Sequence, residues 1–124
     1  MTLAHGSDLT HAIIGLAMRV HRRLGLLESA YVSCLCHEFL RAPLPFKRQA
    51  PLPVIYDDTR MDCAYLADII VDDEVILELK SVERSLRLHE AQLLTYLRLS
   101  PCRIGLLINF NTESVPDGIN CCVP

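Results

Sequence analysis

The sequence predicts one domain of the α/β class, on the border with α+β, in which helices flank a small mixed central β-sheet. Three observations carry this prediction. Two helical patterns open the chain, two strand-like segments then follow each other across an acidic turn, and a third helical pattern precedes an almost unbroken apolar run. The 124 residues are enough for a single domain, so we assign residues 1–124 to one unit.

The three helices are recognised by apolar residues at helical spacing. The first is expected to begin at the capping residues 7–8 and to end at Gly25. The second is expected from Leu27 to the segment 42–45, whose two prolines break it. The third, over residues 85–100, is strongly amphipathic and is followed by a proline.

The strands follow from β-type apolar patterns bounded by turns. Four segments are expected to be strands: 54–56, 61–71, 75–80 and 103–110. Pro51 and Pro53 allow only an edge or irregular strand near the first of them, because proline donates no ladder hydrogen bond. The second and third are expected to form a hairpin, the fourth to be buried on both faces, and the tail after Asn111 to be polar and rich in turns.

Composition excludes some function classes. Lys and Arg number 12 against 15 Asp and Glu, a net charge of -3, so no bulk basic charge indicates a nucleic-acid binder. Only two of the basic residues are lysines, Lys47 and Lys80. No signal peptide and no apolar run of membrane-spanning length is recognised, and we expect a soluble, cytoplasmic protein without a membrane partner.

The six cysteines are spaced for neither a disulfide framework nor a ferredoxin-type cluster. Buried free thiols are therefore the expected state. A zinc site made of Cys34, Cys36 and His37 stays open as an alternative.

Charged residues inside the two hairpin strands are the candidates for chemistry, because unpaired burial of charge is costly. Strand periodicity places Glu78 and Lys80 on one face, and the tight turn brings Asp68 beside them. Two neighbouring carboxylates repel each other unless a cation lies between them, and oxygen ligands suit Mg²⁺ or Mn²⁺. A lysine at such a site can position or deprotonate water. The alternative is a solvated strand face with an ordinary ion pair.

The pattern of Asp68, then Glu78-x-Lys80, then Gln92-x-x-x-Tyr96 resembles the PD-(D/E)XK nuclease superfamily, particularly its RecB-like branch. The segment 25–31, Gly-Leu-Leu-Glu-Ser-Ala-Tyr, is similar to the signature of the GxxExxY protein family, a small bacterial group of that superfamily. Further similar segments are 20–22, 49–54, 89–98 and 105–110.

This resemblance implies a restriction-endonuclease-like core and a divalent-metal-dependent nuclease that hydrolyses phosphodiester bonds, with DNA as the expected substrate. The implied metal ligands are Glu28, Asp68, Glu78 and the backbone carbonyl of Leu79. The implied catalytic set is Asp68, Glu78, Lys80 and Gln92, with Lys80 as the catalytic lysine. Gln92 and Tyr96 would contact substrate phosphate or orient water. His89, on the same helical face, is either a further substrate contact or a half-buried helix histidine.

A second function class stays open, namely a nuclease-fold module for nucleic-acid binding or assembly with weak or no cleavage. The small size and the lack of a basic groove favour this module, or an enzyme that needs a homodimer or a partner protein. Four arginines flank the proposed site in sequence and could hold phosphates, although a solvated charged face is their alternative. They are Arg84, Arg87, Arg98 and Arg103.

Overall fold

The computed structural model describes residues 6–24, 30–82, 87–112 and 118–123. Eight helices and strands lie in these ranges. In chain order they are α1 (Gly6–Leu24), α2 (Tyr31–Arg41), β1 (Phe46–Tyr56), β2 (Thr59–Val71), β3 (Val75–Lys80), α3 (Arg87–Leu99), β4 (Ile104–Asn109) and β5 (Ile119–Cys122). None of the described helices has the length and apolar character needed to cross a bilayer.

The strands form one mixed sheet in the order β1-β2-β3-β4-β5. All neighbouring pairs are antiparallel except β3 and β4, which run parallel. The parallel pair requires a crossover connection, and α3 provides it. The sheet with its three helices confirms the α/β fold and is consistent with a restriction-endonuclease-like core.

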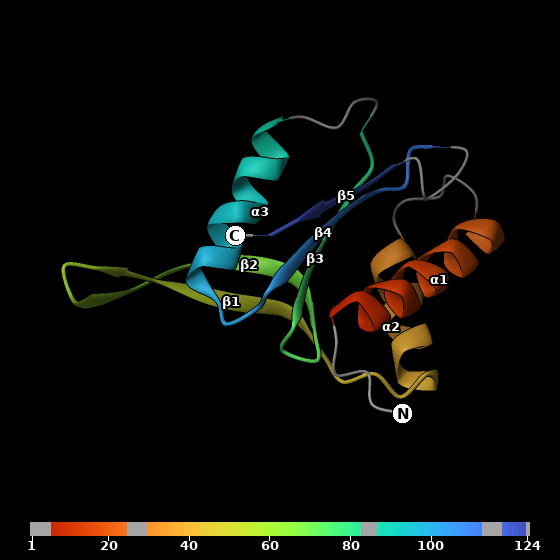
Figure 1. Ribbon diagram of the computed structural model, residues 1–124, viewed down its shortest axis with the longest axis horizontal. Coiled ribbons are helices and arrows are strands. Elements are labelled where there is room, and N and C mark those ends of the chain that lie inside the picture. Colours follow the sequence, from red (N-terminus) through yellow and green to blue (C-terminus); the bar gives the residue numbers. More distant parts are fainter. Residues whose placement is uncertain (1–5, 25–29, 83–86, 113–117, 124) are drawn as a thin grey trace.

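Both faces of the sheet are covered, α1 and α2 lying on one side and α3 on the other (Figure 1). Successive residues of β3 show how the strand serves two cores. Leu77 packs with Leu35 and Phe39 of α2, whereas Ile76 packs with Leu93 and Leu97 of α3. Because side chains alternate across a strand, Glu78 shares the face of Ile76 and points toward the α3 layer.

The predicted elements agree with the observed ones in kind more than in length. The edge position expected from Pro51 and Pro53 is confirmed, but β1 begins at Phe46 and is much longer than the predicted strand 54–56. Proline is tolerated there because an edge strand has one side without a partner. The sequence predicts a polar tail rich in turns after Asn111, and this is wrong for Ile119–Cys122, which pair with β4 as a fifth strand. The predicted start of the second helix at Leu27 lies outside the described residues.

The β1–β2 ladder is irregular at two positions. Its register shifts between Leu52 and Val54, and its backbone is unusual opposite Asp68. Arg48 pairs with Ile69 and Ala50 with Ala67, but Gln49 between them has a φ of 50°. This left-handed conformation is uncommon for a residue other than glycine. Around it the two strands exchange faces, since Arg48 donates a hydrogen bond to Ser33 of α2 whereas Ala50 belongs to the α3-side core.

Beyond this irregularity the two strands leave the sheet as a ribbon. β2 pairs with β3 only over residues 69–71, whereas its pairing with β1 continues to the Tyr56–Thr59 pair. Figure 1 shows the β1–β2 ribbon projecting from the body of the protein. The β2 backbone therefore parts from β3 at the position of Asp68.

Candidate active site

Asp68 and Glu78 meet at a fork in the sheet, which is the point where β2 and β3 part. The last ladder pair is Ile69 with Leu77, and each carboxylate-bearing residue is one position beyond it. The Asp68 N–H donates to Glu78 Oε1 at 3.2 Å, and the Leu79 N–H donates to Asp68 Oδ2 at 2.8 Å. The two carboxylates thus accept backbone N–H groups across the fork, which fixes them next to each other.

Burial gives this pair unusual electrostatics. Glu78 is only 6% exposed. Desolvation by burial, and next the negative charge and a hydrogen bond of Asp68, raise the pKa of Glu78 to about 8, while Lys80 acts in the opposite direction. Two carboxylates held this close therefore share a proton or a cation at neutral pH.

Lys80 follows Glu78 by two residues and is half-buried, opposite Asn109 of β4. Its charge is close enough to lower the pKa of Glu78, yet no ion pair involves Lys80 in the described ranges. Its amine is consequently available for another partner.

The backbone of Leu79 faces the same point. In a paired strand the N–H and C=O of one residue point to the same side. Since the Leu79 N–H reaches Asp68, its carbonyl is directed to that side as well. The next carbonyl, that of Lys80, points the other way and accepts the Phe110 N–H at 2.9 Å.

Helix α3 forms a wall over this face of the sheet. Its close approach depends on Gly105 of β4, where an added Cβ would lie 2.8 Å from Leu93 Cγ. Tyr96 is half-buried, and the pKa of its hydroxyl is raised by burial and then by the negative charges of Glu78 and Asp68.

The remaining predicted residues are less closely tied to the pair. Gln92 is exposed on α3 one turn before Tyr96. His89 is half-buried, and its Nδ1 is buried without a hydrogen-bond partner among the described residues. Glu28 and Arg84 lie outside the described residues.

Sequence reasoning missed one polar residue beside the site, Asn109. It is buried, and its Oδ1 accepts the N–H groups of Val82 at 3.1 Å and of Asn111 at 3.0 Å. Its Nδ2 donates to the Val82 carbonyl at 2.8 Å. Asn109 therefore secures the chain just after Lys80, and the signal for it was an amide at the end of the apolar run 104–108.

The cysteines are the next candidates, either as free thiols or as ligands of a zinc site. The free thiols in the described ranges are Cys34, Cys36, Cys102, Cys121 and Cys122. Cys36 and Cys102 are buried as expected, whereas Cys34 and Cys122 are half-buried and Cys121 is exposed, so the expectation of buried thiols is wrong for these three. Nowhere in the described ranges do three or more His, Cys, Asp or Glu side chains gather into a group that could hold a metal ion. The alternative of a zinc site at residues 34–37 therefore finds no support.

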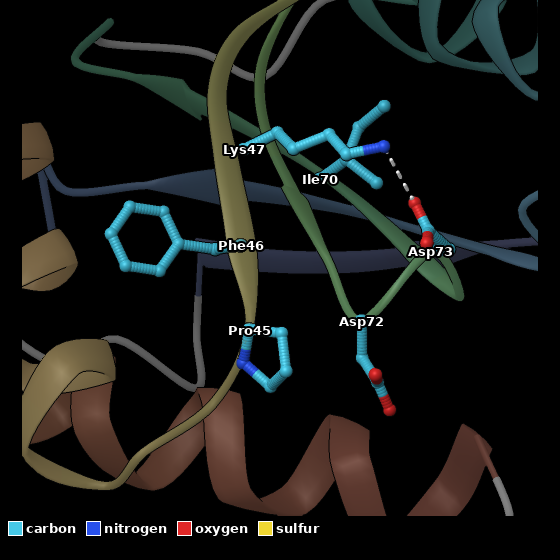
Figure 2. A pocket seen from close by; sticks show the side chains of 6 residues that line it. All are labelled: Pro45, Phe46, Lys47, Ile70, Asp72 and Asp73. Atoms are coloured by element: carbon cyan, nitrogen blue, oxygen red, sulfur yellow. Dashed lines mark hydrogen bonds and ion pairs between the residues drawn. The ribbon is translucent and has the colours of Figure 1, made fainter.

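A small hollow of about 80 Å³ lies at the opposite end of the β2–β3 hairpin. Figure 2 shows Lys47 reaching from β1 toward Asp73 of the hairpin turn, where Nζ and Oδ1 are 3.2 Å apart. Both side chains are 69% exposed, so this is a solvated surface ion pair. The second lysine of the chain thus has a partner away from the Asp68–Glu78 pair.

A family model described as the PD-(D/E)XK nuclease superfamily matches residues 7–120. The chain belongs to the PD-(D/E)XK nuclease superfamily. The match runs from α1 into β5 and so covers nearly all of the fold. No match was found among curated proteins, and none among solved structures. Membership confirms the superfamily predicted from the sequence and associates the chain with nucleases, which act on nucleic acid and typically use divalent metals.

Proposed function

We propose that this PD-(D/E)XK protein is a divalent-metal-dependent nuclease of the cytoplasm that hydrolyses phosphodiester bonds of DNA, with residues 1–124 acting as one domain. One observation carries the proposal. At the point where β2 and β3 part, the buried Glu78 and the half-buried Asp68 have beside them a lysine without an ion-pair partner in the described part of the chain. A structural ion pair would instead bring the lysine into contact with a carboxylate.

The donor set suits Mg²⁺ or Mn²⁺. Asp68 and Glu78 offer carboxylate oxygens, the Leu79 carbonyl is directed to the same side, and Glu28 would add a further carboxylate from outside the described residues. All these donors are oxygens, which hard cations prefer, and a cation would relieve the repulsion that raises the pKa of Glu78. The chemistry supplied by a bound divalent ion is acidification of water and neutralisation of charge on the leaving oxygen.

The side chains of this protein would position the reactants. The amine of Lys80 would align the attacking water and stabilise negative charge on the phosphate. Tyr96, half-buried on α3, and Gln92, exposed one turn earlier, would contact the substrate phosphate or orient water. His89 would contribute a further substrate contact from the same helix.

The finer family assignment is also ours. The GxxExxY-like segment 25–31 and the Gln92-x-x-x-Tyr96 pair support a place in the GxxExxY family, within the RecB-like branch and of bacterial origin.

A second candidate is a nucleic-acid-binding or assembly module with weak or no cleavage. The net charge of -3 favours the assembly role within this candidate, because tight binding to a phosphate backbone needs cations. An enzyme would overcome this lack of positive charge if a homodimer or a partner protein supplied the missing substrate contacts.

The test is a cleavage assay on single-stranded and double-stranded DNA and on RNA, with Mg²⁺ or Mn²⁺. We expect wild-type protein to cleave a DNA substrate, and Lys80→Ala and Asp68→Asn to lose activity by at least about 100-fold. Lys47→Ala is the matched control and should keep full activity, since Lys47 pairs with Asp73 elsewhere. Equal cleavage by Lys80→Ala would reject the assignment of that residue, and no cleavage of any substrate would favour the second candidate.

A further inference from the structure

An exposed tyrosine that the sequence did not single out lies against the site. The ring centroids of Tyr65 and Tyr96 are 5.3 Å apart, and the ring planes are tilted by 50°. Tyr65 lies on β2 three residues before Asp68, and the charges of Asp68 and Glu78 are felt at the Tyr96 hydroxyl, whose pKa they raise after burial. The two aromatic rings therefore form the border between the carboxylates and the β1–β2 ribbon.

The register of the ribbon accounts for this position. Tyr65 pairs with Leu52, which belongs to the α3-side core together with Ala67. Since cross-strand partners share a face, Tyr65 also faces the α3 side, three residues before Asp68 on the same strand. Yet Tyr65 lies beyond the last β2–β3 pair and stays 44% exposed. Its ring has a packing partner on one side and is open to solvent elsewhere.

An exposed aromatic ring beside a phosphodiesterase site has a natural ligand. Bases stack on aromatic side chains in a manner that depends little on sequence, and stacking does not require positive charge. In a duplex each base is already stacked between its neighbours, so only an unpaired base has a face to offer. Stacking would also compensate for the net charge of -3, which disfavours grip on the backbone alone.

We infer that Tyr65 is a binding platform on which an unpaired nucleobase of single-stranded DNA stacks, which places the adjoining phosphodiester at the Asp68–Glu78 pair. This inference rests on the proposed nuclease function and adds its substrate class. Tyr65 is a substrate-binding residue in this account, and Tyr96 supports its ring from α3.

The test measures binding of the full-length protein to a single-stranded DNA oligonucleotide and to the duplex of the same sequence. Ca²⁺ replaces Mn²⁺ to suppress cleavage, and the strand carries a fluorescent adenine analogue whose emission falls on stacking. We expect Tyr65→Ala to weaken single-strand binding by about tenfold or more and to abolish the quenching, without effect on the duplex. Tyr65→Phe, which keeps the ring, should behave as wild type.

Tyr56 provides the matched control. It lies at the end of the same ribbon and is 65% exposed, so Tyr56→Ala removes an equally accessible tyrosine distant from the carboxylates. We expect it to leave binding and quenching unchanged. Tyr65→Leu keeps apolar bulk at the ribbon and removes only the aromatic ring, which answers the case in which Tyr65→Ala fails to fold.

The outcomes separate this inference from the proposed function. Unchanged single-strand binding in a folded Tyr65→Leu variant would overturn the platform, whether or not the wild type cleaves DNA. Absence of any binding by wild-type protein would overturn it as well. Loss of binding and quenching in Tyr65→Leu, with a wild type that cleaves nothing, would support the platform and reject the nuclease function.

Discussion

The two ends of the β2–β3 hairpin carry nearly the same charged groups in very different surroundings. At the turn end, Asp72 and Asp73 are exposed and Lys47 pairs with Asp73 in solvent. At the fork end, Glu78 is buried beside Asp68, and Lys80 has no ion-pair partner within the described residues. Each end thus combines a lysine with carboxylates, which are Asp72, Asp73 and Glu74 at the turn end and Asp68 and Glu78 at the fork end.

In this comparison burial, rather than residue type, distinguishes the surface ion pair from the site that we propose to be reactive. At the turn end water screens the charges, and the pair satisfies itself. At the fork end the α3 layer removes water from Glu78, whose pKa rises to about 8, and the backbone fixes the carboxylates. Variants at the two ends of the hairpin should therefore differ in stability, metal binding and response to pH.

The two ends should differ most in how they make the free energy of unfolding depend on pH. The pKa of Glu78 rises from 4.5 to about 8 on folding, so in between the folded state holds a proton that the unfolded state has lost. The stability due to this proton is complete below about pH 4.5 and is lost, by several kcal/mol, as the pH rises toward 8. Urea unfolding of metal-free protein should show this decline. Glu78→Gln, which keeps an oxygen for the Asp68 N–H, should abolish it, whereas Asp73→Asn should retain it. A flat wild-type profile would contradict the buried pair.

Divalent ions should stabilise only the fork end. A ligand at a hundred times its Kd stabilises the folded state by about 2.7 kcal/mol, so Mn²⁺ should raise the melting temperature of the wild type measurably. Asp68→Ala should remove this increase, because a carboxylate of the proposed site is lost. Asp73→Ala should preserve it. An equal increase in both variants would place the ion elsewhere on the protein.

The contact between α3 and the sheet should matter next. Gly105→Ala places a methyl group against the buried Leu93 side chain, and we expect a loss of about 1–3 kcal/mol in the free energy of unfolding. Gly15→Ala on α1 meets no atom within 4 Å and should instead be neutral or stabilising by up to about 1 kcal/mol. Urea unfolding of the two variants checks the contrast, and an equal effect would show that the space beneath α3 is not tight.

The smallest effect is expected at the turn end. Lys47→Ala should change the free energy of unfolding by no more than about 1 kcal/mol, because exposed pairs gain little in water. A double-mutant cycle with Asp73→Ala measures the interaction itself, which should decrease with added salt. A coupling of several kcal/mol would show that the two ends differ less than their burial indicates.

Much of this site could be predicted because it depends on local register. The turn after Val71 and the alternation of side chains together place Asp68 opposite Glu78, and a hairpin needs little else. The long β1 strand and the fifth strand could not be predicted in the same way. Pro51 and Pro53 argued against a strand, and residues 119–122 carry no strong β pattern, so both depend on the neighbours with which they pair.

The sequence predicted which residues of the β2–β3 hairpin share a face, and with them the juxtaposition of Asp68 with Glu78 and the proposal of Lys80 rather than Lys47. These properties follow from the two-residue period of a strand, which is a local feature. Only the tertiary structure decided that Glu78 is buried, that the ladder exchanges faces at Gln49 and that Tyr65 rests on Tyr96. Burial and ring contacts depend on segments far apart in the chain, and no local pattern encodes how closely such segments approach.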